Sequence, residues 1–195
     1  MTRKRMSTGK ALHNKGLSPC PAFGGAEGTL PYSLRTVPER LLKYKELAAA
    51  FSYPKKEELR LEYDRLFRLS EIWLYGAEYT AENEFQRVKE LSDISGFYRA
   101  FGLQVDKERP DALSCELEFM HYLIYKEFYA LKKNISKAQE KAGICRDARK
   151  KFFETHLYPA ANGICHKILS FPQDNLYLKI AKELLEFLET EKKYI

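Results

Sequence analysis

Apolar residues at helical spacing run through the chain from Pro38 onward, and they constrain its fold more than any other feature. In the clearest segment they recur at steps of 4, 3, 4 and 4, which places them on one face of a helix. These residues are Leu113, Leu117, Met120, Ile124 and Phe128. No segment shows the two-residue alternation of a half-buried strand. The pattern predicts an all-α fold, a single helical bundle of about six or seven helices over residues 38–195.

Five positions predict where helices begin, end or break. Pro38 suits the first turn of a helix, where a missing N–H costs nothing. Thr80 is expected to cap a helix that ends at Gly102, a natural left-handed stop. Asp111, next to Pro110, is expected to open the helix with the clearest periodicity, and Pro159 is expected to break or kink a later one.

The first 37 residues differ from the rest, and we expect them to form an irregular arm. They hold five of the ten glycines and show no helical period. Their net charge is +5, whereas the remaining 158 residues carry only +1. The folded body therefore lacks the basic stripe typical of a DNA-binding domain. We expect no nucleic-acid partner, and nucleic-acid binding through the basic arm is a weaker alternative.

The four cysteines are Cys20, Cys115, Cys145 and Cys165, and no two stand at a C-x-x-C spacing. We interpret them as reduced thiols of a cytoplasmic protein, three of them on helices. No apolar run approaches the ~20 residues that span a bilayer, so no transmembrane helix is expected. The basic N-terminus is not followed by an apolar stretch, so it is not predicted to be a secretory signal.

Catalytic signatures are missing from the chain. It has no glycine-rich nucleotide motif, no H-E-x-x-H and no G-x-S-x-G. Di-iron bundles need Glu-x-x-His pairs on two helices, and only Glu118 and His121 form one. His156 and His166 lie ten residues apart across a proline, so they encode no local metal site. We predict no metal, no cofactor and no enzymatic activity; the alternative is a helical-bundle enzyme that uses a small cofactor or metal.

Two segments together resemble the TorD/DmsD/NarJ family, the chaperones dedicated to molybdopterin oxidoreductases. They are F-Y-R-A-F-G-L at Phe97–Leu103 and E-x-P-D-x-L-x-x-E-L-E-F-M at Glu108–Met120. The F-F-x-x-H-L segment at 152–157 and the S-Y-P turn at 52–54 are also similar to family segments. The resemblance covers roughly residues 38–190 and leaves the arm outside it. Two family features are missing, since Ala112 stands where a histidine is usual and Ala160 where a tryptophan often follows.

The resemblance implies a cytoplasmic chaperone that binds the apo form of a molybdopterin oxidoreductase catalytic subunit, its leader peptide, or both, until the cofactor is inserted. A twin-arginine leader has a basic start and an apolar middle, so its receptor needs an apolar groove with carboxylates. We expect the site where the two central segments meet. The candidate residues are Tyr98, Phe101, Gly102, Glu108, Pro110, Asp111, Glu116, Glu118 and Phe119.

Structural roles for the same residues remain open. Asp111 could be only a helix cap, Glu116 and Glu118 could form a solvated helix face, and the aromatic residues Tyr98, Phe101 and Phe119 could belong to the core. A monomer and a domain-swapped dimer are both compatible with long helices joined by short hinges.

Overall fold

The computed structural model describes residues 12–14, 37–106, 108–133, 135–172 and 175–195. Seven α-helices of eleven or more residues build the described part, which confirms the all-α prediction. They are α2 (Val37–Ala50), α3 (Glu57–Phe67), α5 (Glu84–Ala100), α6 (Leu113–Lys132), α7 (Ala138–Phe152), α8 (Tyr158–Leu169) and α9 (Leu176–Glu191). Three short helical elements complete the described part, namely the four-residue α4 (Ala77–Thr80), the π-helical turn Phe153–Leu157 and the terminal 3-10 turn Lys192–Tyr194.

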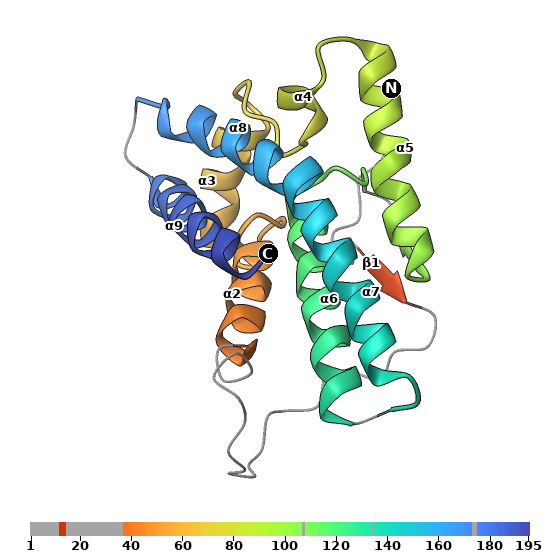
Figure 1. The fold of residues 1–195 in the computed structure, drawn as a ribbon. Coiled ribbons are helices and arrows are strands. Elements are labelled where there is room, and N and C mark those ends of the chain that lie inside the picture. Colours follow the sequence, from red (N-terminus) through yellow and green to blue (C-terminus); the bar gives the residue numbers. More distant parts are fainter. Residues whose placement is uncertain (1–11, 15–36, 107, 134, 173–174) are drawn as a thin grey trace.

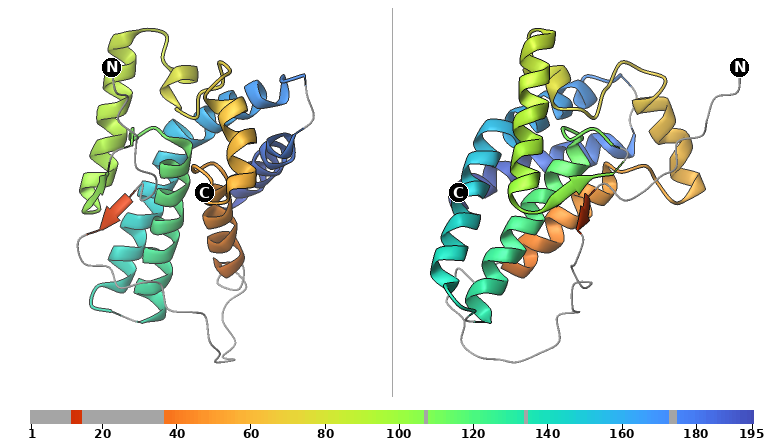
Figure 2. Two further views of the ribbon diagram at one scale, coloured as in Figure 1. Left: turned by 180° about the vertical axis from the view of Figure 1, so that it is seen from behind. Right: turned by 90° about the vertical axis from the view of Figure 1, so that its right-hand side faces the viewer.

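Helix α6 lies at the centre of the bundle (Figures 1 and 2). Helix α7 runs beside it in the opposite direction, α2 packs against another side, and α8 and α9 pack against each other. The face predicted from the spacing is buried, since none of its five residues, from Leu113 to Phe128, is more than 6% exposed. Burying such a stripe stabilises the fold by about 1.5–3 kcal/mol per large side chain.

Pro159 does not end the chain's helical course, so the predicted break is absent, but the α-helical pattern is interrupted just before it. Helices α7 and α8 are joined without a loop by one π-helical turn, Phe153–Leu157, and Pro159 stands in the first turn of α8. The amide of Tyr158 donates to the Phe153 carbonyl, five residues back. The wider turn just before the proline is where a missing N–H and a bulky ring are most easily accommodated.

Thr80 does not cap the helix that runs to Gly102. It ends α4, and its hydroxyl donates to the Glu90 carboxylate at 2.7 Å. The cap of α5 is Asn83, whose side-chain oxygen accepts the amide hydrogen of Gln86 at 3.0 Å. Threonine and asparagine are both good N-cap residues. Thr80 does not act as the cap because its hydroxyl binds the Glu90 carboxylate instead. Gly102 has a φ of 71°, so the predicted left-handed stop is confirmed.

One two-stranded antiparallel ribbon accompanies the helices. Strand β1 (Leu12–Asn14) pairs with β2 (Leu103–Val105), with His13 opposite Gln104. Three-residue strands are too short to show a sequence period, which is why none was predicted. Val37, the last residue of the predicted arm, begins α2, and residues 1–11 and 15–36 of the arm lie outside the described residues. Among the described residues, no helix is long and apolar enough to cross a membrane.

Candidate functional site

Asp111 lies at the junction of α4 with the start of α6. Its side chain is fully buried, and its Oδ2 accepts the amide hydrogen of Ala77 at 3.1 Å. Its backbone carbonyl accepts from Gly76 at 2.8 Å. Asp111 therefore caps α4, whereas the N-cap of α6 is Ala112, which makes no side-chain cap bond. The prediction that Asp111 opens the 113–132 helix is wrong because the carboxylate turns toward a different helix.

Arg109 covers the Asp111 carboxylate. It donates through Nε to Oδ1 at 3.0 Å and through Nη2 to Oδ2 at 2.8 Å, the bidentate geometry that arginine makes with carboxylates. Its third nitrogen donates to Glu78 at 2.7 Å, and its guanidinium lies 4.4 Å from the Tyr75 ring centroid. The Tyr75 hydroxyl in turn donates to Glu108. These contacts tie residues 108–112, called here the PD loop, to residues 75–78.

Glu116 is buried below the PD loop. Neither of its carboxylate oxygens has a hydrogen-bond partner among the described residues. Burial raises its pKa well above the ordinary value, and the charges of Asp111 and Glu90 add to that shift. Glu116 therefore does not lie on a solvated face. Glu118, one residue past Leu117, is only partly buried, and burial also raises its pKa.

Tyr98 and Phe119 lie inside an aromatic cluster, so the core interpretation is correct for both. Their ring centroids are 4.9 Å apart, and Phe119 is 4.8 Å from Phe152. The Tyr98 hydroxyl donates to the Pro110 carbonyl at 2.8 Å, which links the cluster to the PD loop. Phe101 lies at the cluster's edge and is only partly buried.

The structure brings the nine predicted residues into one region but divides them by depth. Four are buried and cannot line an open cleft, namely Tyr98, Asp111, Glu116 and Phe119. The other five reach the surface at least in part, namely Phe101, Gly102, Glu108, Pro110 and Glu118. The region therefore consists of a buried anchor, formed by the first four residues, and a surface rim, formed by the other five.

Sequence reasoning missed an exposed surface beside the PD loop. Ile72 and Leu74 point inward, at 3% and 8% exposure, whereas the chain's single tryptophan, Trp73, is 50% exposed. Tyr75 follows in the same outward register and pairs with Ala112 in an isolated antiparallel bridge. The alternation of residues 72–75, I-W-L-Y, is the sequence signal that could have predicted the outward position of Trp73. We call Leu69, Glu71, Trp73, Tyr75 and Glu108 the Trp73 surface.

The Trp73 surface lies in an acidic region. Residues 69–80 and 108–112 hold four carboxylates and one arginine, a net charge of −3, although the whole body is nearly neutral. Two of these carboxylates, Glu71 and Glu108, are exposed. Exposed aromatic area next to negative charge suits a ligand that is both basic and apolar.

His156, in the F-F-x-x-H-L segment, links α5 to the π-turn. Its Nε2 is 2.8 Å from the Asp93 carboxylate, and its ring packs against Phe97 and Phe152. No group of three or more histidine, cysteine, aspartate or glutamate residues that could hold a metal occurs in the described part of the chain. His156 is thus placed as a contact between helices.

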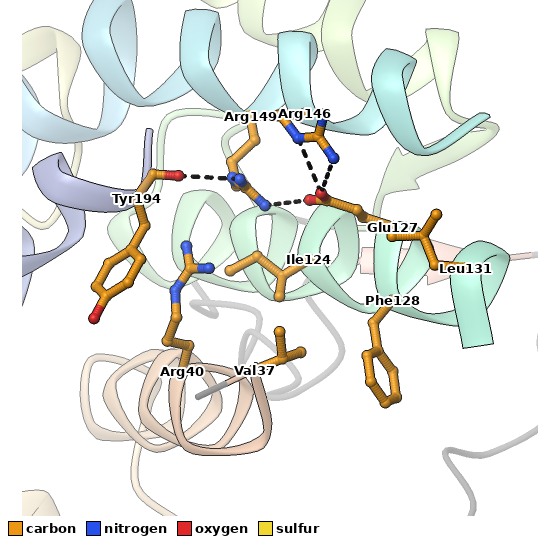
Figure 3. A pocket seen from close by; sticks show the side chains of 9 residues that line it. All are labelled: Val37, Arg40, Ile124, Glu127, Phe128, Leu131, Arg146, Arg149 and Tyr194. Atoms are coloured by element: carbon orange, nitrogen blue, oxygen red, sulfur yellow. Dashed lines mark hydrogen bonds and ion pairs between the residues drawn. The ribbon is translucent and has the colours of Figure 1, made fainter. Parts of the chain in front are cut away.

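A cavity of about 310 Å³ lies at the other end of α6 (Figure 3). Its lining is Val37, Arg40, Ile124, Glu127, Phe128, Leu131, Arg146, Arg149 and Tyr194, none of them a predicted site residue. Arg149 donates to Glu127 and to the Tyr194 carbonyl, and Arg40 forms a bidentate pair with Glu191. These arginines therefore serve internal ion pairs.

Both motif segments that meet at this buried polar anchor lie in the part of the chain that matches a known protein family. The chain is a member of the nitrate reductase delta subunit family, whose model matches residues 36–165. This confirms the resemblance to the TorD/DmsD/NarJ family. The perchlorate reductase assembly chaperone protein of Dechloromonas aromatica (strain RCB) is 38% identical over 70 residues, which cover 34% of this chain and 29% of that protein.

Proposed function

We propose that the protein is a cytoplasmic chaperone for a molybdopterin oxidoreductase, and that it binds the apo catalytic subunit, its leader peptide, or both, until the cofactor is inserted. Membership in the delta subunit family supports this proposal. The name of the perchlorate reductase relative, an assembly chaperone protein, agrees with it.

The Trp73 surface is the observation that carries the proposal. It combines exposed Leu69 and Trp73 with two exposed carboxylates, those of Glu71 and Glu108, and Glu108 belongs to the second motif segment. A leader with a basic start and an apolar stretch would place its arginines near Glu108 and its apolar residues along Trp73. Tyr75 lies between Trp73 and Glu108 in sequence, and its hydroxyl donates to Glu108.

The buried motif residues have a positioning role in this proposal. Asp111 and Arg109 fix the PD loop against α4, and Tyr98 holds the Pro110 carbonyl from below. A loop held in this way presents Glu108 without losing much conformational entropy on binding. Phe101, Gly102 and Glu118 extend the rim toward α5 and α6.

A labelled synthetic peptide with a twin-arginine start and an apolar middle tests the proposal by fluorescence anisotropy. Glu108→Gln keeps the size of the side chain and an acceptor for Tyr75 but removes the charge. Loss of a charge-assisted contact costs about 1.5–3 kcal/mol, which is roughly a tenfold to hundredfold loss of affinity. Glu186→Gln, an exposed change on α9, is the matched control and should leave the affinity unchanged.

A second substitution tests the apolar half of the surface. Leu69→Ser removes a side chain that is 83% exposed, so folding should be unaffected while leader affinity falls. Unchanged affinity in both Glu108→Gln and Leu69→Ser would place the leader site elsewhere.

A further inference from the structure

Strand β2 offers a backbone edge within the motif region. It directly follows Gly102, begins at the last residue of the family segment Phe97–Leu103, and ends before the second segment, Glu108–Met120. Its partner β1 comes from the arm, about 90 residues earlier in the chain, and pairs with it antiparallel. The family model begins only at residue 36, so β1 lies outside the matched region.

An edge strand of this kind binds extended segments through their backbone. Its unpaired N–H and C=O groups form a template to which any extended chain can add. The ladder with β1 is only three residues long, from Leu12 opposite Val105 to Asn14 opposite Leu103. So short a ladder holds few hydrogen bonds, and each contributes little net stability. Another extended segment can therefore replace β1 as the partner of β2.

The charge of the arm matches the region into which β2 leads. Residues 1–37 carry a net charge of +5, whereas residues 69–80 and 108–112 together carry −3. Five of the basic residues lie close to β1 in sequence, namely Arg3, Lys4, Arg5, Lys10 and Lys15. The arm thus has the basic character expected of a leader's start, and it reaches the motif region through β1.

We propose that the β2 edge is a docking site for an extended basic segment, and that the chain's own arm occupies it through Leu12–Asn14 and competes with the partner's peptide. The partner's identity rests on the proposed function; the occupation by the arm rests on the β1–β2 ladder. A tethered segment acts at an effective concentration on the order of millimolar. An incoming peptide then binds only the fraction of molecules whose edge is free, and its apparent Kd rises by the inverse of that fraction.

Proline substitutions in the full-length chain test this proposal. Pairs along an antiparallel ladder alternate between hydrogen-bonded and non-hydrogen-bonded. The two variants are the single change His13→Pro and the double change Leu12→Pro/Asn14→Pro. One of them therefore removes backbone N–H groups that face β2, and the other removes backbone N–H groups that point away from β2. Proline is tolerated on an edge where its N–H is not used, so the second variant is the matched control for the first.

The probe is a labelled synthetic peptide of this chain's own residues 1–18, added in trans. We expect one proline variant to bind it about tenfold more tightly than the wild type, and the other to bind it as the wild type does. A probe with Arg3, Lys4 and Arg5 replaced by Gln should bind the improved variant several-fold more weakly. Equal probe affinity for the wild type and both variants would overturn the proposal.

The leader peptide separates this proposal from the proposed function. If the arm probe behaves as expected while no leader binds, the docking edge stands and the leader role fails. If the leader binds but neither the leader nor the arm probe gains affinity in either proline variant, the leader role stands and the competing arm is refuted.

Discussion

Asp111 caps the first turn of α4 from 34 residues further along the chain, through an Oδ2 that accepts the amide hydrogen of Ala77 at 3.1 Å. The same carboxylate receives the bidentate pair from Arg109. One buried charge thus holds together the PD loop and α4, both of which border the Trp73 surface.

Asp111→Asn should destabilise the fold. Asparagine is as good a cap as aspartate, but it removes the charge that faces Arg109, whose remaining carboxylate partner is Glu78. Hydrogen bonds to charged groups contribute about 1.5–3 kcal/mol, so we expect a loss of about 2 kcal/mol in urea unfolding. Glu108→Gln, in the same loop but exposed, should change stability by less than about 0.5 kcal/mol. An unchanged midpoint for Asp111→Asn would contradict the anchoring role.

Glu116→Gln should flatten the dependence of stability on pH. The pKa of Glu116 is raised in the folded state, so the native protein binds more protons than the unfolded chain above the ordinary glutamate pKa. The contribution of Glu116 to the free energy of unfolding is therefore at its maximum at low pH. It falls by about 1.4 kcal/mol per pH unit as the pH rises toward the raised pKa of the folded state. Glutamine stays neutral, so the variant should gain on the wild type between pH 5 and 8.

Urea midpoints measured across that pH range check this prediction. Glu57→Gln, an exposed change in the first turn of α3, serves as the control and should keep the wild-type pH slope. Parallel curves for the wild type and Glu116→Gln would show that the buried carboxyl is not the source of the slope.

Adding one methyl group at Gly76 or Gly163 should destabilise the protein. A Cβ at Gly76 would lie 2.7 Å from the Cβ of Ala160, and one at Gly163 would lie 2.5 Å from the Cβ of Tyr79. Both clashes would force α4 and α8 apart. Overpacking of this kind costs about 1–3 kcal/mol.

The matched controls are Gly96→Ala in α5 and Gly143→Ala in α7, where an added Cβ meets nothing within 4 Å. Alanine in a helix interior is better than glycine by about 0.5–1 kcal/mol, so these two variants should melt higher than the wild type. If all four variants shifted the melting temperature in the same direction, the close approach of α4 to α8 would be wrong.

Glu191→Gln should be costly although it lies at the far end of the chain. Glu191 is 1% exposed and accepts from Arg40 at 2.7 and 2.8 Å and from Tyr44 at 3.0 Å. Breaking a buried pair costs about 3–5 kcal/mol. Glu189→Gln, two residues away in an exposed pair with Lys192, should leave stability nearly unchanged. Thermal unfolding of the two variants decides the matter.

Much of the fold was predictable because its information is local. The 4-3-4-4 spacing from Leu113 to Phe128 determines which face of α6 is buried, whatever packs against it. Gly102 stops a helix because the left-handed conformation suits a residue without a Cβ. The motif segments likewise located the region of the candidate site.

The depth of each site residue was decided by tertiary structure. Glu116 and Glu118 are two positions apart on one helix, yet packing against α4 and α8 buries the first completely and leaves the second partly exposed. Trp73 faces outward only because Ile72 and Leu74 face the core. No local pattern states which neighbour will cover a side chain.

The sequence by itself determined the helices, the family and the region of the candidate site, because periodicity, helix stops and motif residues act over a few positions of the chain. Only the tertiary structure decided that Asp111 serves α4, that Pro159 follows a π-turn, and that β1 pairs with β2. Each of these depends on a partner that the packing of the whole bundle brings close. A short stretch of sequence does not contain that partner, so it cannot predict the contact.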